Sequence, residues 1–121
     1  MEGFYLFPLG ETPKMSIGVS GVLFNHSCVT ILNNPKYFAV YKKDSEILIM
    51  AAHKKASNTI TARTKMNGKT VGRIKRDWVT REWINEIHRY KGGERFSIQG
   101  LIGMDKGRKY ILFDFKQATR R

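Results

Sequence analysis

The dipeptide Asn67-Gly68 is the feature of this sequence that most constrains its fold. Both residues tolerate a positive φ, so the pair favours a two-residue turn between antiparallel strands. Runs rich in β-forming residues flank the pair at Thr59–Arg63 and Thr70–Ile74. The sequence therefore predicts a β-hairpin in the middle of the chain.

Further short strands are expected on both sides of this hairpin. Tyr37–Tyr41 and Ile47–Ala51 surround a polar turn, which indicates a second hairpin. Ser16–Phe24 begins with alternating apolar residues and predicts one strand near the N-terminus. Two more strands are expected near the C-terminus, at Arg95–Gln99 and at Lys109–Phe115. The chain should therefore be mostly antiparallel β-structure.

Two short helices are expected between these strands. Asn25 is a suitable N-cap for the first helix, which should continue to Leu32. Thr80 is expected to cap the second helix, and Gly92-Gly93 to end it. The apolar stripe of this second helix contains Trp83, Ile84, Ile87 and Tyr90.

The expected fold class is α+β, with antiparallel strands in a twisted sheet or a small barrel and two short helices. Each half has the order strand, helix, hairpin, and an internal duplication is one explanation of it. A length of 121 residues indicates a single domain, which we place at residues 15–116. Residues 1–14 are expected to form an irregular arm whose aromatic side chains pack on the domain or meet a partner. Residues 117–121 are expected to form a frayed basic tail.

Charge gives the strongest indication of function. The chain has 22 Lys and Arg residues against 10 Asp and Glu residues, a net charge of +12. None of this excess lies in residues 1–50, and no acidic residue occurs between Glu46 and Asp77. Like charges packed together cost folding free energy through self-repulsion, so a segment of one sign indicates a polyanionic partner.

We expect this basic segment to contact nucleic acid, because Lys and Arg gain affinity for phosphates by counterion release. No aromatic residue lies between Lys54 and Arg76 to stack on single-stranded bases, so duplex DNA is favoured. The hairpin at Asn67-Gly68 can act as a ribbon that enters a groove. The predicted contact residues are Lys54, Lys55, Arg63, Lys65, Lys69, Arg73, Lys75 and Arg76.

The sequence does not favour a membrane protein or a secreted one. Its longest apolar run, Ile47–Ala52, has six residues, whereas a membrane-spanning helix needs about 20. The apolar segment Gly3–Leu9 follows Glu2 instead of a basic region, so we expect no signal peptide. The single cysteine, Cys28, is expected to be a small buried hydrophobe in a reducing, cytoplasmic compartment.

No pattern of catalytic or metal-binding residues stands out in the sequence. His26, His53 and His88 are isolated, the carboxylates are scattered, and no phosphate-loop motif is present. We therefore expect no metal, no cofactor and no enzymatic activity. A metal-independent ribonuclease that uses His53 with nearby Lys and Arg residues is the enzymatic alternative.

The first half of the sequence resembles a known family of regulators. Gly21–Asn25, the helix to Leu32, Tyr37–Tyr41 and Ile47–Met50 are similar in order to the swapped-hairpin transition-state regulators of the AbrB type, including the duplicated MraZ branch. The resemblance covers about residues 15–52 and, less closely, 68–115, where Gly72-Arg73-Ile74 keeps the family's Gly-Arg-apolar step. It implies a small β-barrel of interlocking hairpins from two copies, and DNA binding through Arg and Lys on strands and loops. The sequence also looks like small uncharacterised proteins of bacterial mobile elements.

The charge and the resemblance together predict a DNA-binding protein that acts as a homodimer and regulates transcription or a mobile-element process. An RNA-binding or ribosome-associated protein is an alternative, because the same charge attracts RNA. A protein-interaction module with an acidic partner is another alternative.

Overall fold

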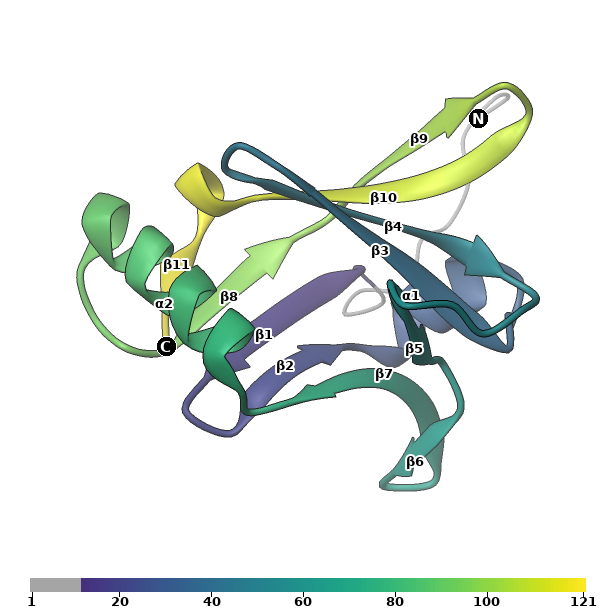
Figure 1. The fold of residues 1–121 in the computed structure, drawn as a ribbon, viewed down its shortest axis with the longest axis horizontal. Coiled ribbons are helices and arrows are strands. Elements are labelled where there is room, and N and C mark those ends of the chain that lie inside the picture. Colours follow the sequence, from purple (N-terminus) through teal and green to yellow (C-terminus); the bar gives the residue numbers. More distant parts are fainter. Residues whose placement is uncertain (1–11) are drawn as a thin grey trace, which may run out of the picture.

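A computed structural model describes residues 12–121 as two antiparallel sheets with two helices (Figure 1). The strand order is β11-β8-β1-β2-β7-β6 in sheet A and β5-β3-β4-β10-β9 in sheet B. The strands of sheet A are β1 (Lys14–Gly18), β2 (Gly21–Phe24), β6 (Thr64–Met66), β7 (Lys69–Lys75), β8 (Phe96–Gln99) and β11 (Thr119–Arg120). The strands of sheet B are β3 (Tyr37–Lys43), β4 (Glu46–Ala52), β5 (Thr59–Thr61), β9 (Leu101–Asp105) and β10 (Arg108–Asp114). The α+β class predicted from the sequence is confirmed.

The core lies between the two sheets, because alternating residues of each strand point inward. Phe24 of sheet A contacts two rings of sheet B, with centroid distances of 6.0 Å to Phe38 and 5.5 Å to Phe113. The helices α1 (His26–Ile31) and α2 (Trp78–Lys91) lie at opposite ends of the two-layer structure (Figure 1). A short 3-10 helix, η1 (Phe115–Gln117), leads from β10 to the last strand.

Helix α1 forms as the sequence predicts. The Asn25 side chain accepts a hydrogen bond from the Cys28 amide at 3.4 Å, which caps the first turn. Asn33 and Asn34 follow the helix with φ of 64° and 51°, a conformation that asparagine tolerates. Cys28 is fully buried, as expected, and burial raises the pKa of its thiol to about 12.

The N-cap of helix α2 lies three residues before the predicted N-cap, Thr80. Asp77 is the N-cap, and its side chain accepts a hydrogen bond from the Thr80 amide at 3.0 Å. The Thr80 hydroxyl accepts one from the Asp77 amide, also at 3.0 Å, so both residues form a capping box. Trp83 is buried in the predicted stripe, but Tyr90 is 48% exposed because it lies in the last turn, beyond the core. Gly92 ends the helix, as predicted, with φ of 67°.

Two strand predictions are wrong in detail. Ser16–Phe24 is a tight hairpin of β1 and β2 instead of one strand, since Gly21 adopts φ of 118° after the turn. The hairpin at Asn67-Gly68 is confirmed, but its first strand is β6 (Thr64–Met66). The expected strand at Thr59–Arg63 shortens to β5, which pairs with β3 in the other sheet.

The order of elements repeats along the chain. The first half contains β1, β2, α1, β3 and β4, and the second contains β6, β7, α2, β9 and β10, with β5, β8 and β11 outside the repeat. In sheet A, β2 pairs with β7 so that Val22 lies opposite Ile74. These two residues are 52 positions apart, as are the helix caps Asn25 and Asp77.

Sheet B shows the same relation. Strand β4 pairs with β10 so that Ile49 lies opposite Ile111, 62 positions later. The turn residues with positive φ, Asp44 and Lys106, are also 62 positions apart. Equivalent strands that pair antiparallel with each other are expected of two units related by an approximate two-fold axis. Each sheet therefore receives one hairpin from each half of a single chain.

The two sheets are open, so the molecule is not the closed barrel that was one alternative and that the family resemblance implies. Sheet A ends at β11 and β6, and sheet B ends at β5 and β9. The predicted frayed tail instead contributes β11, which pairs with β8 after the buried Ala118. Of the expected N-terminal arm, residues 1–11 lie outside the described part of the chain, and Lys14 begins β1. Within residues 12–121, no helix combines the length and apolar character needed to cross a membrane.

Candidate nucleic-acid interface

The outer face of sheet A is the face directed away from the core, and the strand registers place its residues in rows. One row crosses β11, β8, β1, β2 and β7. Its members are Thr119, Ser97, Ser16, Leu23 and Arg73. Residues next to these along each strand, such as Ile17 and Val22, point into the core.

The adjacent row is basic at both ends and has glycines in its centre. Gly18 lies opposite Gly21, which lies opposite Lys75. Arg95 lies on the other side of Gly18, since a Cβ added to Gly18 would be 3.4 Å from Cγ of Arg95. The amide of Arg121 donates to the carbonyl of Arg95 at 2.9 Å, so these two arginines are neighbours.

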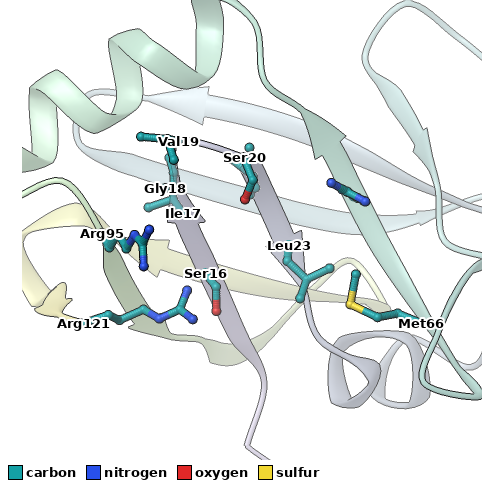
Figure 2. Close-up of a pocket in the computed structure, with 12 residues that line it drawn as sticks. Ser16, Ile17, Gly18, Val19, Ser20, Leu23, Met66, Arg95 and Arg121 are labelled. Carbon is teal, nitrogen blue, oxygen red and sulfur yellow. The ribbon is translucent and has the colours of Figure 1, made fainter.

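A hollow of about 370 Å³ opens on this face. Figure 2 shows Arg95 and Arg121 together on one side of it, and Leu23 and Met66 on the other. We call Arg95 and Arg121 the first basic wall, and Arg73 and Lys75 the second basic wall. The floor between them consists of Ser16, Gly18, Gly21 and Leu23. Three strand spacings of about 4.8 Å separate β8 from β7, so the backbones of the walls are roughly 14 Å apart.

The charges of both walls are available to a ligand. All four side chains are exposed. Within residues 12–121, the only ion pair closer than 4.0 Å joins Lys42 and Glu86, and no acidic residue of that range lines the hollow. Serine hydroxyls and unpaired guanidinium groups can donate hydrogen bonds to phosphate oxygens, so the surface suits an anionic polymer.

The structure places some of the predicted contact residues on this face. Arg73 and Lys75 are alternate residues of β7 and point outward, with Arg73 at the hollow. Lys69 is exposed at the start of β7, where it lines a separate hollow beside α1. Lys65 lies opposite Thr70 in the β6–β7 hairpin, so it is on the other side of that ribbon from Lys69. The hairpin is a continuation of the strand that carries the second basic wall.

The remaining predicted residues lie elsewhere. Lys54 and Lys55 are exposed in the loop between β4 and β5, which belongs to sheet B. Arg63 lies in the link between β5 and β6. Arg76 lies between β7 and α2, where it lines a separate hollow with Arg81. All eight predicted residues are exposed, but the structure does not gather them on one surface.

Arg95 and Arg121 were missed from the sequence. They lie 22 and 48 positions after Arg73, outside the basic segment, and only the pairing of β8 with β1 and of β11 with β8 brings them to the same face. Polar and apolar residues alternate in residues 95–99, which puts Arg95 and Ser97 on one side of a strand. This pattern was the sequence signal that could have identified Arg95.

The histidines have structural partners or lie apart from the basic walls. His26 Nδ1 donates to the Thr70 carbonyl at 2.9 Å, which connects α1 with β7. His88 Nδ1 donates to the Gly93 carbonyl at 2.8 Å at the end of α2. His53 is exposed in the β4–β5 loop. Among the described residues, no group of three His, Cys, Asp or Glu side chains could hold a metal ion.

The comparisons with known proteins found no matching family model, no similar curated protein and no similar solved structure. The chemistry of the described surface is therefore the guide to function.

Proposed function

We propose that the outer face of sheet A binds the phosphate backbones of duplex DNA. The observation that supports this most strongly is the pair of basic walls with a smooth floor between them. Arg73, Arg95 and Arg121 surround a hollow that no acidic residue of the described chain lines. Glycine and serine in the floor allow a sugar-phosphate backbone to approach the sheet closely.

The geometry favours a duplex over a single strand. The separation of the walls, roughly 14 Å at the backbone, is similar to the width of about 12 Å of the major groove. Each wall can therefore face the phosphates of a different strand. Single-strand binding relies on aromatic platforms, and no aromatic side chain of the described residues lines the hollow.

The β6–β7 hairpin extends the proposed interface. It projects from the same strand that carries Arg73 and Lys75 (Figure 1). Lys65 and Lys69 lie near its tip, on opposite sides of the ribbon, and Asn67 and Gly68 form the turn. A two-stranded ribbon fits the major groove, so the hairpin can add contacts beyond those of the walls.

As the role of this binding we propose transcription regulation in the cytoplasm by a homodimer. The resemblance of residues 15–52 to the AbrB-type regulators supports a regulatory role, although the fold does not share their closed barrel. The single buried cysteine suits a reducing compartment. RNA binding and binding to an acidic protein are the alternative functions that the same positive charge supports.

The test is a fluorescence-anisotropy titration of a labelled DNA duplex at several salt concentrations. The variant is Arg73→Ala/Arg95→Ala/Arg121→Ala, and the control is Arg89→Ala/Lys91→Ala/Lys106→Ala. The control removes three exposed positive charges outside the walls, so both variants have the same net charge. The slope of log K against log salt should fall by about 2.7 in the variant, at 0.9 per lost phosphate contact, and should stay unchanged in the control.

Other ligands in the same assay separate the rival functions. Structured RNA that binds more tightly than the duplex would favour the RNA-binding reading. Polyglutamate that binds while neither nucleic acid does would favour an acidic protein partner. Equal slope changes in both triple variants would mean that binding follows net charge and that the outer face of sheet A is not the interface.

A further inference from the structure

The outer face of sheet B carries two rows of uncharged, mostly apolar residues. The first row crosses β9, β10, β4 and β3 and consists of Leu101, Leu112, Leu48 and Tyr41. The second row crosses the same strands and consists of Gly103, Tyr110, Met50 and Ala39. At the two ends of the first row, Leu101 and Tyr41 are 64% and 49% exposed. We call these two rows the apolar face.

The described helices leave the apolar face open. Helix α1 packs against β7, and α2 packs against η1 and β1, at opposite ends of the structure (Figure 1). The ring of Tyr110 lies across Gly103, because a Cβ added to that glycine would clash with the ring. The apolar face is therefore a flat surface that another flat surface can cover.

The size of sheet B suits a stable protein interface. The sheet has five strands, and its longest strands have seven residues. At about 4.8 Å per strand and 3.4 Å per residue, its outer face measures roughly 500 Å² in projection. Side-chain relief raises the accessible area toward the about 800 Å² that each partner buries in a standard interface.

Charge favours a second copy of this chain as the partner. The net charge of +12 makes two copies repel each other over much of their surface, but neither row of the apolar face has a charged residue. The ends of the strands carry opposite charges. At one end Glu46 lies opposite Asp114, and at the other end Arg108 lies opposite Asp105.

These flanking charges specify how the second copy is oriented. If the two-fold axis crosses the strands, β10 of one copy lies on β10 of the other in the reverse direction. Asp114 then faces Arg108 of the second copy, and symmetry makes this pair twice. An axis parallel to the strands would instead bring Glu46 against Asp114 of the second copy, and like charges disfavour that arrangement.

We propose that the apolar face joins two copies of the chain back to back, about the axis that crosses the strands. The outer faces of sheet A then point in opposite directions, because in each copy they lie on the far side of the core. Four sheets stacked about 10 Å apart put the two outer sheets about 30 Å from each other. With a duplex on each of them, the dimer bridges two DNA segments. The bridging rests on the proposed function, whereas the interface does not.

Sedimentation of the full chain without DNA, over a series of concentrations, tests the interface. Tyr41→Lys/Leu101→Lys places two charges in the apolar face. The control, Trp78→Lys/Tyr90→Lys, adds the same charges at exposed aromatic positions of α2. Wild type and control should dimerise alike, and the face variant should have a dissociation constant at least about tenfold higher.

Two results of this experiment would overturn the proposal. One is a wild type that stays monomeric up to about 1 mM, which would leave the face to a different protein. The other is the same dissociation constant in the face variant and the control.

Charge variants test the orientation. Arg108→Asp and Asp114→Arg each bring like charges together, so each variant alone should dimerise weakly. An equimolar mixture should form heterodimers, because one native pair and one reversed pair then meet. Asp114→Arg also removes the hydrogen bond from the Lys116 amide, but mixing would not repair a folding defect. A mixture that dimerises no better than the separate variants would overturn the orientation.

A capture assay tests the bridge. A duplex fixed to beads should retain a second, fluorescent duplex when wild type is added, and at least about tenfold less with Tyr41→Lys/Leu101→Lys. Anisotropy with one duplex should give this variant the same affinity as its control. No capture by a dimer that binds one duplex normally would overturn the bridge. Loss of single-duplex binding by an intact dimer would overturn the proposed function and the bridge but not the interface.

Discussion

The outer faces of the two sheets differ in chemistry although their inner faces build one core. Sheet A shows Arg and Lys walls around a floor of Ser and Gly. On sheet B, the registers align Leu101, Leu112, Leu48 and Tyr41 in one row across β9, β10, β4 and β3. The inward-facing side chains of each strand are constrained by core packing, whereas the outward-facing side chains are free to contact a ligand or a partner. Sheet A therefore suits an anion, and sheet B suits an apolar contact.

The largest effect is expected from reversing the charge of the walls. Arg73→Glu/Arg95→Glu/Arg121→Glu should weaken binding of duplex DNA by about 1000-fold, because three attractive contacts become repulsive. The melting temperature should change little, since all three side chains are exposed.

Arg89→Glu/Lys91→Glu/Lys106→Glu is the matched control for this reversal. It gives the same net charge but leaves the walls intact. Its DNA affinity, measured by the same anisotropy titration, should remain well above that of the wall variant. Equal losses of DNA affinity in the two variants would mean that the basic walls of sheet A contribute no more to binding than other surface charges.

The floor of sheet A should be sensitive to a backbone change at Gly21. This residue has φ of 118°, and an added Cβ would lie 2.2 Å from the Ile74 carbonyl oxygen. Gly21→Ala should therefore lower the free energy of unfolding by about 2–3 kcal/mol, measured by urea denaturation. Gly68→Ala, also at a positive φ of 79° but with open space around it, should cost about 1 kcal/mol. Similar losses at both positions would show that the contact with Ile74 is not tight.

Filling the floor without straining the backbone should affect binding more than stability. A Cβ at Gly18 would make only an ordinary contact of 3.4 Å with Arg95. Gly18→Leu should weaken duplex binding by about tenfold, or about 1.4 kcal/mol, by holding phosphates away from the walls. Thr61→Leu on the exposed edge strand of sheet B is the control and should leave binding unchanged. Unchanged binding in Gly18→Leu would mean that no ligand approaches the floor.

The smallest effect concerns the interior that both sheets share. Burial raises the pKa of the Cys28 thiol to about 12 from an ordinary value of 9.0, so above pH 9 the unfolded chain binds fewer protons than the folded one. Stability should therefore fall as pH rises from 9 toward 12, by about 1 kcal/mol between pH 9 and 10 from this group alone. In Cys28→Ala, urea denaturation should show a shallower decline over this range. An identical decline in both proteins would indicate that Cys28 is not closed off from water.

Local signals in the sequence predicted most of the elements but not how distant elements meet. Asn67-Gly68 and Asn25 specify a turn and a cap by their own chemistry, and both predictions hold. Thr80 was a plausible cap, yet the reciprocal bonds with Asp77 make it the third helical residue. Strand β5 pairs with β3 because sheet pairing depends on partners far along the chain, which local propensity does not reveal.

The candidate site shows the same limit. Arg73 and Lys75 were predicted because they lie in a dense basic segment, and the alternation of β7 puts both on one face. Arg95 and Arg121 complete that face only through the order of strands in sheet A. Lys54 and Lys55 have the same charge but lie beside sheet B. Charge density along the sequence thus indicated the kind of partner, and strand order determines which charges can meet it.

The most direct test of the central claim is a nuclear magnetic resonance titration of the labelled protein with duplex DNA. If the outer face of sheet A is the interface, shifts should concentrate on β7, β8, β1 and β11 and on the guanidinium groups of Arg73, Arg95 and Arg121. The outer face of sheet B, represented by Leu48 and Leu112, should stay unchanged. Shifts confined to sheet B or to the loop of Lys54 and Lys55, with the three arginines unaffected, would contradict the account.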